Sequence, residues 1–202
     1  MTDSSSRRVG ANYRILPSER LTFEAEGWVR LPGVMAEAEL APLIEIFESF
    51  RHGEIPVRGR DFCDMAGGYE RRAEDFAVVN IMLPRLYLPE WRDNLYEQRA
   101  ASVARELVGA GLALDYDQLL AKRPGAKDAV FAWHQDLAYW PMTPDPLTVT
   151  CWLALDDATE ENGCLKFVSG SHREPQLRAH RPLHSDREES HTLVAEVDEA
   201  RD

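Results

Sequence analysis

The segment Trp133-His134-Gln135-Asp136 places an imidazole and a carboxylate two positions apart. In an extended strand, side chains at positions i and i+2 point to the same face, so both groups can reach one metal ion. A histidine and a carboxylate are two of the three protein ligands in the facial triad of non-haem Fe(II) sites. The pattern His-x-Asp also occurs by chance, and the alternative interpretation is a hydrogen-bonded His–Asp pair on a strand.

Four further histidines follow this motif and are candidates for the remaining ligand. His172 comes after a Gly-Ser turn, which favours a loop residue over a metal ligand. His180, His184 and His191 could in principle supply a distal ligand, but they lie in a charged stretch without a strand pattern. That context predicts exposed side chains for all three.

The elements that would position these groups begin with helices. Apolar residues at helical spacing predict an amphipathic helix over Ala36–Phe50, and a second helix is predicted over Pro89–Val108. A short strand is predicted over Trp28–Leu31, and an apolar, strand-like segment over Phe76–Leu83. Residues 1–20 are predicted to be a loose N-terminus.

Strand patterns dominate the rest of the chain. Short apolar or alternating segments predict strands over Gln118–Lys122, Ala129–Trp133, Leu147–Leu155 and Leu165–Val168. In the third segment one face is aliphatic and the other is mixed, with Thr148, Thr150, Trp152 and Ala154. Helices first and strands second predict an α+β fold with a mainly β core, in which N-terminal helices pack outside an antiparallel barrel or sandwich.

Length and composition narrow the function classes. The 202 residues predict a single domain. The net charge of −12 would repel nucleic acid, so no nucleic-acid partner is expected. No run reaches the ~18 apolar residues of a membrane span, so no membrane partner is expected. The 3 cysteines form no CxxC pair and the first residues lack an apolar core, which together predict a cytoplasmic protein.

Two blocks of sequence resemble a known family. WHQDLAYWP, from Trp133, and TVTCWLALDDATEENGCLKFVSGSH, ending at His172, are similar to the phytanoyl-CoA dioxygenase family of Fe(II)- and 2-oxoglutarate-dependent oxygenases. The resemblance implies a double-stranded β-helix, which is a jelly-roll or cupin-like fold. It implies that His134 and Asp136 are catalytic iron ligands, and that Fe(II) is the cofactor, with 2-oxoglutarate and O₂ as cosubstrates. Trp152 matches a family tryptophan that lines the cosubstrate pocket.

The resemblance has one departure. In the family, a distal histidine gives the third iron ligand, and an arginine shortly after it binds the far carboxylate of 2-oxoglutarate. No matching block follows His172. We therefore expect an incomplete double-stranded β-helix whose C-terminal strands are missing. The unpaired strand edges of such a sheet would favour oligomerisation.

The resemblance predicts an Fe(II)/2-oxoglutarate-dependent dioxygenase that hydroxylates a small organic molecule. The alternative is a truncated, catalytically inactive β-helix fragment or a binding subunit. A zinc hydrolase is a weaker interpretation, since no HExxH motif accompanies His134 and Asp136. The net charge favours a small neutral or cationic substrate over an anionic CoA ester. An aromatic rim over Tyr139–Pro141 would border this substrate or cover the mouth of the barrel.

Overall fold

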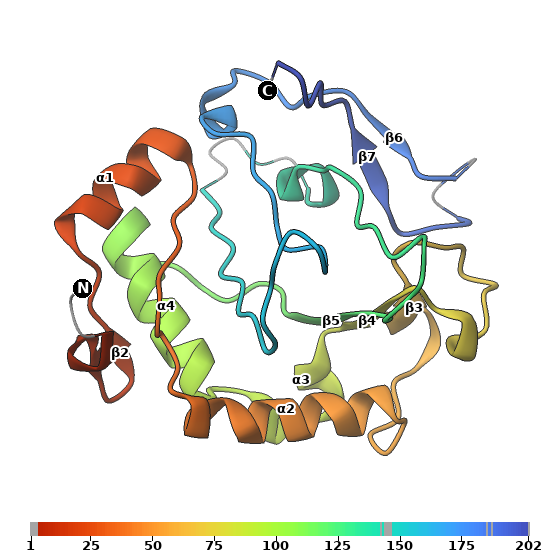
Figure 1. The fold of residues 1–202 in the computed structure, drawn as a ribbon, viewed down its shortest axis with the longest axis horizontal. Helices are drawn as coiled ribbons and strands as arrows, with labels where there is room; N and C mark the ends of the chain where they lie inside the picture. Colours follow the sequence, from red (N-terminus) through yellow and green to blue (C-terminus); the bar gives the residue numbers. More distant parts are fainter. Residues whose placement is uncertain (1–3, 142, 144–146, 185, 187, 202) are drawn as a thin grey trace. The chain divides into compact units, whose positions relative to one another are not determined.

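The computed structural model describes residues 4–141, 143, 147–184, 186 and 188–201 (Figure 1). The chain divides into two compact units, each built from three stretches of sequence. The first unit contains Met1–Ile46, Pro89–Asp115 and Leu147–Glu174, and the second contains Phe47–Leu88, Tyr116–Pro146 and Pro175–Asp202. All described strand pairs are antiparallel, which confirms the predicted α+β class with antiparallel sheets.

The N-terminal part of the first unit is more ordered than its polar sequence predicts. Tyr13 is fully buried, and its hydroxyl donates a hydrogen bond to the Pro32 carbonyl at 2.7 Å. Arg7 is also buried and forms an ion pair with Glu19. One aromatic anchor and one buried ion pair therefore order a segment that looks loose in sequence. Its short elements are η1 (Ser4–Arg7), β1 (Arg8–Val9) and β2 (Asn12–Tyr13).

Helix α1 (Pro17–Glu26) has clear start and stop signals. The Glu19 carboxylate accepts a hydrogen bond from the Leu16 N–H at 2.7 Å, which satisfies one of the free donors at the helix start. Gly27 ends the helix with a φ of 82°, a conformation that glycine adopts without steric cost. A Cβ on Gly27 would lie 2.4 Å from Nδ1 of His172, so this position has no room for a side chain.

Helix α4 (Leu95–Val108) covers most of the second predicted helix. It begins late because Asn94 caps it, accepting a hydrogen bond from the Glu97 N–H at 3.0 Å. The preceding Pro89–Trp91 forms a separate 3-10 turn, η4. The buried Val103 of α4 packs with the core of the first unit, which also contains Tyr13 and Ile15.

Helix α2 (Glu37–Arg51) confirms the predicted amphipathic helix to within one residue at each end. Its buried face carries Leu43, Phe47 and Phe50. Glu39, in its first turn, forms a two-pronged ion pair with Arg99 of α4, with N–O distances of 2.6 and 2.8 Å. The Arg99 side chain is only 4% exposed, so this pair ties the two helices together out of contact with most of the solvent.

The second unit contains a three-stranded antiparallel sheet in the order β3-β4-β5. Strand β4 (Val78–Met82) lies within the predicted apolar segment, and β5 (Gln118–Lys122) confirms the predicted strand at both ends. Strand β3 (Phe62–Asp64) was not predicted. Met65, directly after β3, joins the buried cluster of this unit, against which the partly buried Phe131 packs.

Asp64, the last residue of β3, is a buried polar centre of the second unit. Its side chain is inaccessible to solvent and accepts hydrogen bonds from the N–H groups of Ala66, Ala77 and Val78 at 2.9–3.0 Å. The Arg71 guanidinium donates a fourth bond at 2.6 Å. Burial alone would raise the pKa of Asp64, but these hydrogen bonds to the carboxylate outweigh it and the pKa is lowered.

A hairpin of β6 (His180–Pro182) and β7 (Leu193–Ala195) completes the second unit (Figure 1). The sequence did not predict it, because charged residues surround a very short apolar core. Leu193 and Ala195 are both buried. The buried Thr192 joins the hairpin to the sheet, since its hydroxyl donates to the Met65 carbonyl at 2.6 Å.

Four predicted strands are wrong for the described part of the chain: Trp28–Leu31, Ala129–Trp133, Leu147–Leu155 and Leu165–Val168 are not strands. Four large apolar side chains of the last two segments are exposed, among them Leu147 at 60% and Phe167 at 53%. An alternating pattern makes a strand only where another strand pairs with it. The predicted mainly β core is therefore reduced here to short antiparallel sheets.

Within the described residues, no helix is long and apolar enough to cross a membrane.

Candidate metal centre

His134 and Asp136 lie together in the second unit. Nε2 of His134 is 3.2 Å from Oδ1 of Asp136. The His134 ring is mostly buried. It makes an edge-to-face contact with the Phe131 ring, with ring centroids 4.6 Å apart. The Asp136 carboxylate is more exposed, at 42%. The pair is therefore supported from the core and open on the carboxylate side.

The other ring nitrogen of His134 fixes which atom faces Asp136. Nδ1 lies 2.8 Å from the carbonyl oxygen of Ala132, so it carries the proton and donates to that oxygen. In the neutral ring, Nε2 is then the nitrogen with a free lone pair, which is the form that binds metals. Histidines that bind metals usually hold their second nitrogen in this way.

The pKa of His134 reflects a competition between its surroundings. Burial disfavours the charged ring and lowers the pKa. The hydrogen bonds with Asp136 and with the Ala132 carbonyl favour the charged ring, and the net pKa is raised. Without a metal ion, the Asp136 carboxylate thus favours a proton on the His134 ring. The same negative charge would favour a cation between the two side chains.

The chain brings the two side chains together in a different way from the predicted strand. Gln135 is extended, with φ −115° and ψ 123°, and the 3-10 turn η5 (Asp136–Tyr139) follows at once. The change from extended chain to turn places Asp136 beside His134. The spacing argument predicted the proximity correctly, but the local structure that produces it was wrong.

The hairpin β6–β7 holds both ends of this motif. The Ala195 N–H donates to the Trp133 carbonyl at 2.7 Å. The Leu193 N–H donates to the Tyr139 hydroxyl oxygen at 2.8 Å. The Tyr139 ring in turn contacts the ring of His134, with centroids 5.9 Å apart. Hydrogen bonds from the hairpin thus hold the motif in place of the neighbouring strand that the sequence predicts.

The other histidines fall into different places. His172 belongs to the first unit, where its Nε2 lies 3.3 Å from the Glu24 carbonyl at the end of α1. His184 is exposed, as predicted. His191 stacks on Tyr139, with ring centroids 5.3 Å apart, and His180 is partly buried at the start of β6. Among the described residues, no three His, Cys, Asp or Glu side chains gather closely enough to hold a metal ion.

Trp152, the predicted cosubstrate-pocket residue, belongs to the first unit. Its side chain is 50% exposed and lies in a segment without regular structure. The neighbouring Cys151 is held by α4, since the Tyr96 hydroxyl donates to its carbonyl at 2.7 Å. The role of Trp152 stays a prediction, whereas the contact between His134 and Asp136 is a feature of the structure.

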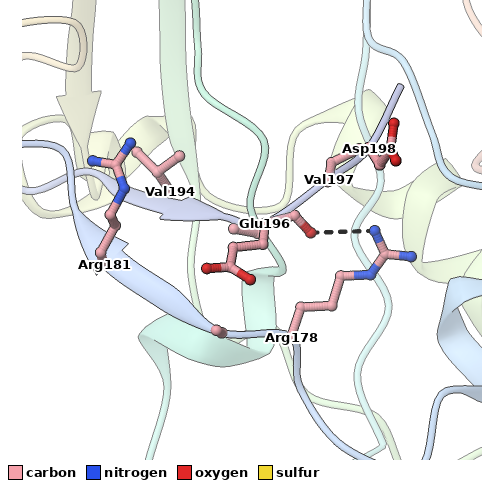
Figure 2. A pocket seen from close by; sticks show the side chains of 8 residues that line it. Arg178, Arg181, Val194, Glu196, Val197 and Asp198 are labelled. Atoms are coloured by element: carbon pink, nitrogen blue, oxygen red, sulfur yellow. Dashed lines mark hydrogen bonds between the residues drawn. The ribbon is translucent and has the colours of Figure 1, made fainter. Parts of the chain in front are cut away.

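A pocket of about 630 Å³ opens beside the hairpin. Figure 2 shows Arg178 turned toward the backbone of Glu196, to whose carbonyl it donates a hydrogen bond at 3.3 Å. Neither His134 nor Asp136 lines this pocket. Its walls are Arg178, Ala179, Arg181, Val194, Ala195, Glu196, Val197 and Asp198.

Sequence reasoning missed the residues that support the pair. Gln135 was treated only as the spacer between two ligands, and His180 only as a substitute ligand. The short apolar run Leu193–Ala195 is the local sequence signal of the hairpin, and it covers only three residues. The partners of Gln135 and Tyr139 lie far along the chain, so no local pattern reveals them.

Comparison with known proteins adds independent information. The sequence model of the family described as Phytanoyl-CoA dioxygenase (PhyH) matches residues 23–201. Ectoine dioxygenase of Bordetella parapertussis is 27% identical over 156 residues, which are 76% of this chain and 48% of that protein. Human peroxisomal phytanoyl-CoA dioxygenase is 34% identical over 167 residues, with 77% and 47% covered. L-proline trans-4-hydroxylase of Streptomyces griseoviridis is 24% identical over 157 residues, with 75% and 53% covered.

The chain spans about half the length of the curated relatives it matches, from 47% to 53% in the three given above. No solved structure matches it significantly.

Proposed function

The chain belongs to the phytanoyl-CoA dioxygenase family of Fe(II)- and 2-oxoglutarate-dependent oxygenases, and from this premise we propose that it forms part of an enzyme that hydroxylates a small organic molecule. His134 and Asp136 would hold the iron. The observation that carries the proposal is their contact, with Nε2 of His134 3.2 Å from Oδ1 of Asp136.

The donor atoms fit the expected metal. One imidazole nitrogen and one carboxylate oxygen are two of the three protein donors of a facial iron site. The Ala132 carbonyl fixes the tautomer that leaves Nε2 of His134 as the donor. Bound iron would supply the oxidising chemistry, together with 2-oxoglutarate and O₂. The protein's own part is to fix the His134 tautomer, to direct Nε2 at Asp136 and to pack the rings of Phe131 and Tyr139 against the imidazole.

Two of the three donors come from the described residues, so the third would come from elsewhere in the complete site. We propose the double-stranded β-helix of the family as the fold of that complete site. The segments Leu147–Leu155 and Leu165–Val168, with their strand-like sequence patterns, support this proposal. The exposed apolar side chains of these segments, among them Leu147 and Phe167, support the proposed oligomerisation.

The proposed substrate is a small neutral or cationic molecule. The net charge of −12 disfavours a strongly anionic molecule such as a CoA ester. L-proline, named in one relative, is a small molecule of the favoured kind, whereas phytanoyl-CoA, named in another, is not. Trp152 is proposed to line the 2-oxoglutarate pocket. The proposed compartment is the cytoplasm, as the composition predicted.

A second candidate is a binding subunit or an inactive fragment of the same fold. The observation that favours it is that the described residues contain no cluster of three potential metal ligands. In this case His134 and Asp136 would be an ion pair that stabilises the turn η5. Metal binding separates the two candidates.

The test is Fe(II) binding under anaerobic conditions, followed by tryptophan fluorescence, with and without 2-oxoglutarate. We expect the unmodified chain to bind and His134→Ala to lose binding, because an imidazole donor is removed. The control is His184→Ala, which changes an exposed histidine and should bind normally. Equal affinity in His134→Ala and the unmodified chain would refute the assignment. Succinate formation after O₂ is admitted then tests for the oxygenase.

A further inference from the structure

Gln135, the residue between the two proposed ligands, is held at two points by the start of the hairpin. Its backbone N–H donates to Nε2 of His180 at 3.2 Å. Its side-chain Oε1 accepts a hydrogen bond from the Arg178 N–H at 2.8 Å. Gln135 is thus fixed through its main chain by His180 and through its side chain by Arg178, at the start of β6.

The His180 ring can accept this bond because its other nitrogen is occupied. Nδ1 of His180 lies 2.7 Å from the Arg178 carbonyl, so Nδ1 carries the proton and Nε2 offers its lone pair. The Gln135 N–H is a main-chain donor that needs an acceptor when it is removed from water. In a regular sheet that acceptor would be a carbonyl of the next strand. Here the imidazole of His180 takes that place.

The same strands hold the flanks of the motif. His180 pairs with Ala195 across the hairpin, and the Ala195 N–H binds the Trp133 carbonyl at 2.7 Å. The bond from the Leu193 N–H to the Tyr139 hydroxyl secures the far side of the turn. With both flanks fixed, rotation of the backbone at Gln135 would still separate His134 from Asp136. His180 and Arg178 oppose that rotation.

We propose that His180 is a positioning residue for the metal centre, acting through Gln135 rather than as a metal ligand. The inference rests on the proposed function, since it assumes that His134 and Asp136 bind the metal. Both ring nitrogens of His180 are engaged by main-chain groups, so neither is available to a metal ion without breaking one of these bonds. Supporting residues of this kind typically change metal affinity 10- to 100-fold when they are removed.

The experiment measures Co(II) affinity of the whole chain, with Co(II) alone as the probe. His180→Phe keeps a ring of similar size and removes the acceptor. His180→Gln places an amide oxygen near the position of Nε2 and should restore the acceptor. The matched control is His184→Phe, on an exposed position in the turn of the same hairpin. We expect His180→Phe to weaken binding about tenfold or more, and His180→Gln and His184→Phe to stay within about threefold of the unmodified chain.

A second measurement reports the hydrogen bond directly and needs no metal. Hydrogen exchange of the Gln135 amide should be slow in the unmodified chain and in His180→Gln, and faster in His180→Phe. If His180→Phe does not fold, His180→Asn replaces it, because the shorter amide can keep the bond to the Arg178 carbonyl but does not reach the Gln135 N–H. The same tenfold weakening of Co(II) binding is expected.

The outcomes separate the inference from the function on which it rests. Normal Co(II) affinity in His180→Phe overturns the positioning role. A loss in His180→Gln as large as in His134→Ala also overturns it, because His180 would then be a ligand. If His134→Ala binds Co(II) as well as the unmodified chain, the proposed metal centre itself fails, whatever the His180 variants do.

Discussion

Two segments carry the family resemblance, and the structure treats them differently. Trp133–Tyr139 has little regular secondary structure, yet hydrogen bonds from β6 and β7 hold it at several main-chain and side-chain atoms. Leu147–Val168 has the clearer strand pattern, yet it forms no strand in the part of the chain that the structure describes, and its large apolar side chains are exposed.

The difference shows that a strand pattern and a held backbone are separate properties. Alternation of apolar and polar residues states which face of a segment could be buried. Whether the segment is held depends on donors and acceptors that other parts of the chain supply. Trp133–Tyr139 receives them from the hairpin. Leu147–Val168 contacts α4 through Cys151, and the Phe167 ring stacks on Trp28.

The largest effect is expected from removing the buried carboxylate of Asp64, which belongs to the same unit as the held segment. Asp64→Ala leaves the N–H groups of Ala66, Ala77 and Val78 without their acceptor, and it leaves the Arg71 guanidinium with only its ion pair to Asp128. We expect a loss of about 3–5 kcal/mol in the free energy of unfolding. Urea unfolding followed by fluorescence measures it. The control is Asp75→Ala, an exposed carboxylate paired with Arg72, which should cost less than about 0.5 kcal/mol.

The same carboxylate makes a pH prediction. Because the folded pKa of Asp64 is lowered, its contribution is fully present above the pKa of an unfolded aspartate and is lost as the pH falls through the folded pKa. The unmodified chain should therefore lose stability in acid more steeply than Asp64→Ala. Parallel pH profiles for the two proteins would contradict this account.

A comparison of amide hydrogen exchange tests the two segments directly. The amides of Leu193 and Ala195 donate to the held segment, so we expect their exchange to be slow. The amides of Trp152 and Leu153 donate no hydrogen bond that the structure describes. We expect them to exchange about 100-fold faster than the amides of Leu193 and Ala195. Equal protection would show that Leu147–Val168 is paired in solution, and the contrast between the segments would disappear.

A moderate effect is expected at the ion pair between Glu39 of α2 and Arg99 of α4. Hydrogen bonds from Arg99 lower the pKa of Glu39 from 4.5 to about 2. Glu39→Gln should cost about 1–2 kcal/mol at neutral pH, allowing for solvent near a carboxylate that is 29% exposed. Since the folded pKa is lowered, this difference should shrink as the pH falls from 4.5 and vanish near 2. The exposed pair of Glu48 and Arg51 provides the control, through Glu48→Gln.

The smallest effect on stability is expected at Trp152. A buried core tryptophan would cost about 3–5 kcal/mol on replacement by alanine. Because Trp152 is 50% exposed, we expect Trp152→Ala to cost about 1 kcal/mol or less. If Trp152 lines the cosubstrate pocket, the same change should raise the apparent KM for 2-oxoglutarate. A large loss of stability with unchanged KM would make it a core residue instead.

Sequence predicted best where the signal is local. Helix α2 and strand β5 were placed almost to the residue, because helical spacing and a short apolar run are both complete within the element. The proximity of His134 and Asp136 followed from their spacing. The N-terminal order around Tyr13 was missed, since its partner Pro32 lies elsewhere in the chain.

The supports of the candidate site could not be predicted for the same physical reason. In the sequence, nothing distinguishes Asp64 from an exposed acidic residue, because the N–H groups of Ala77 and Val78 that it binds lie in another segment. His180 and Gln135 are 45 positions apart, and their hydrogen bond leaves no pattern in either segment. Conversely, Leu147–Leu155 has every local mark of a strand, yet none of the described strands pairs with it.

The bond between Thr192 and Met65 has a consequence for the order of folding. It joins residues 127 positions apart, whereas the bonds of Asp64 to Ala77 and Val78 span only 13 and 14 positions. Long loops are costly to close, so short-range contacts form more readily than long-range ones. We expect the sheet β3–β4–β5 to assemble early and the hairpin to dock late. His134 and Asp136 would then acquire their fixed geometry only in the last step, and a metal ion present during refolding would act on that step alone.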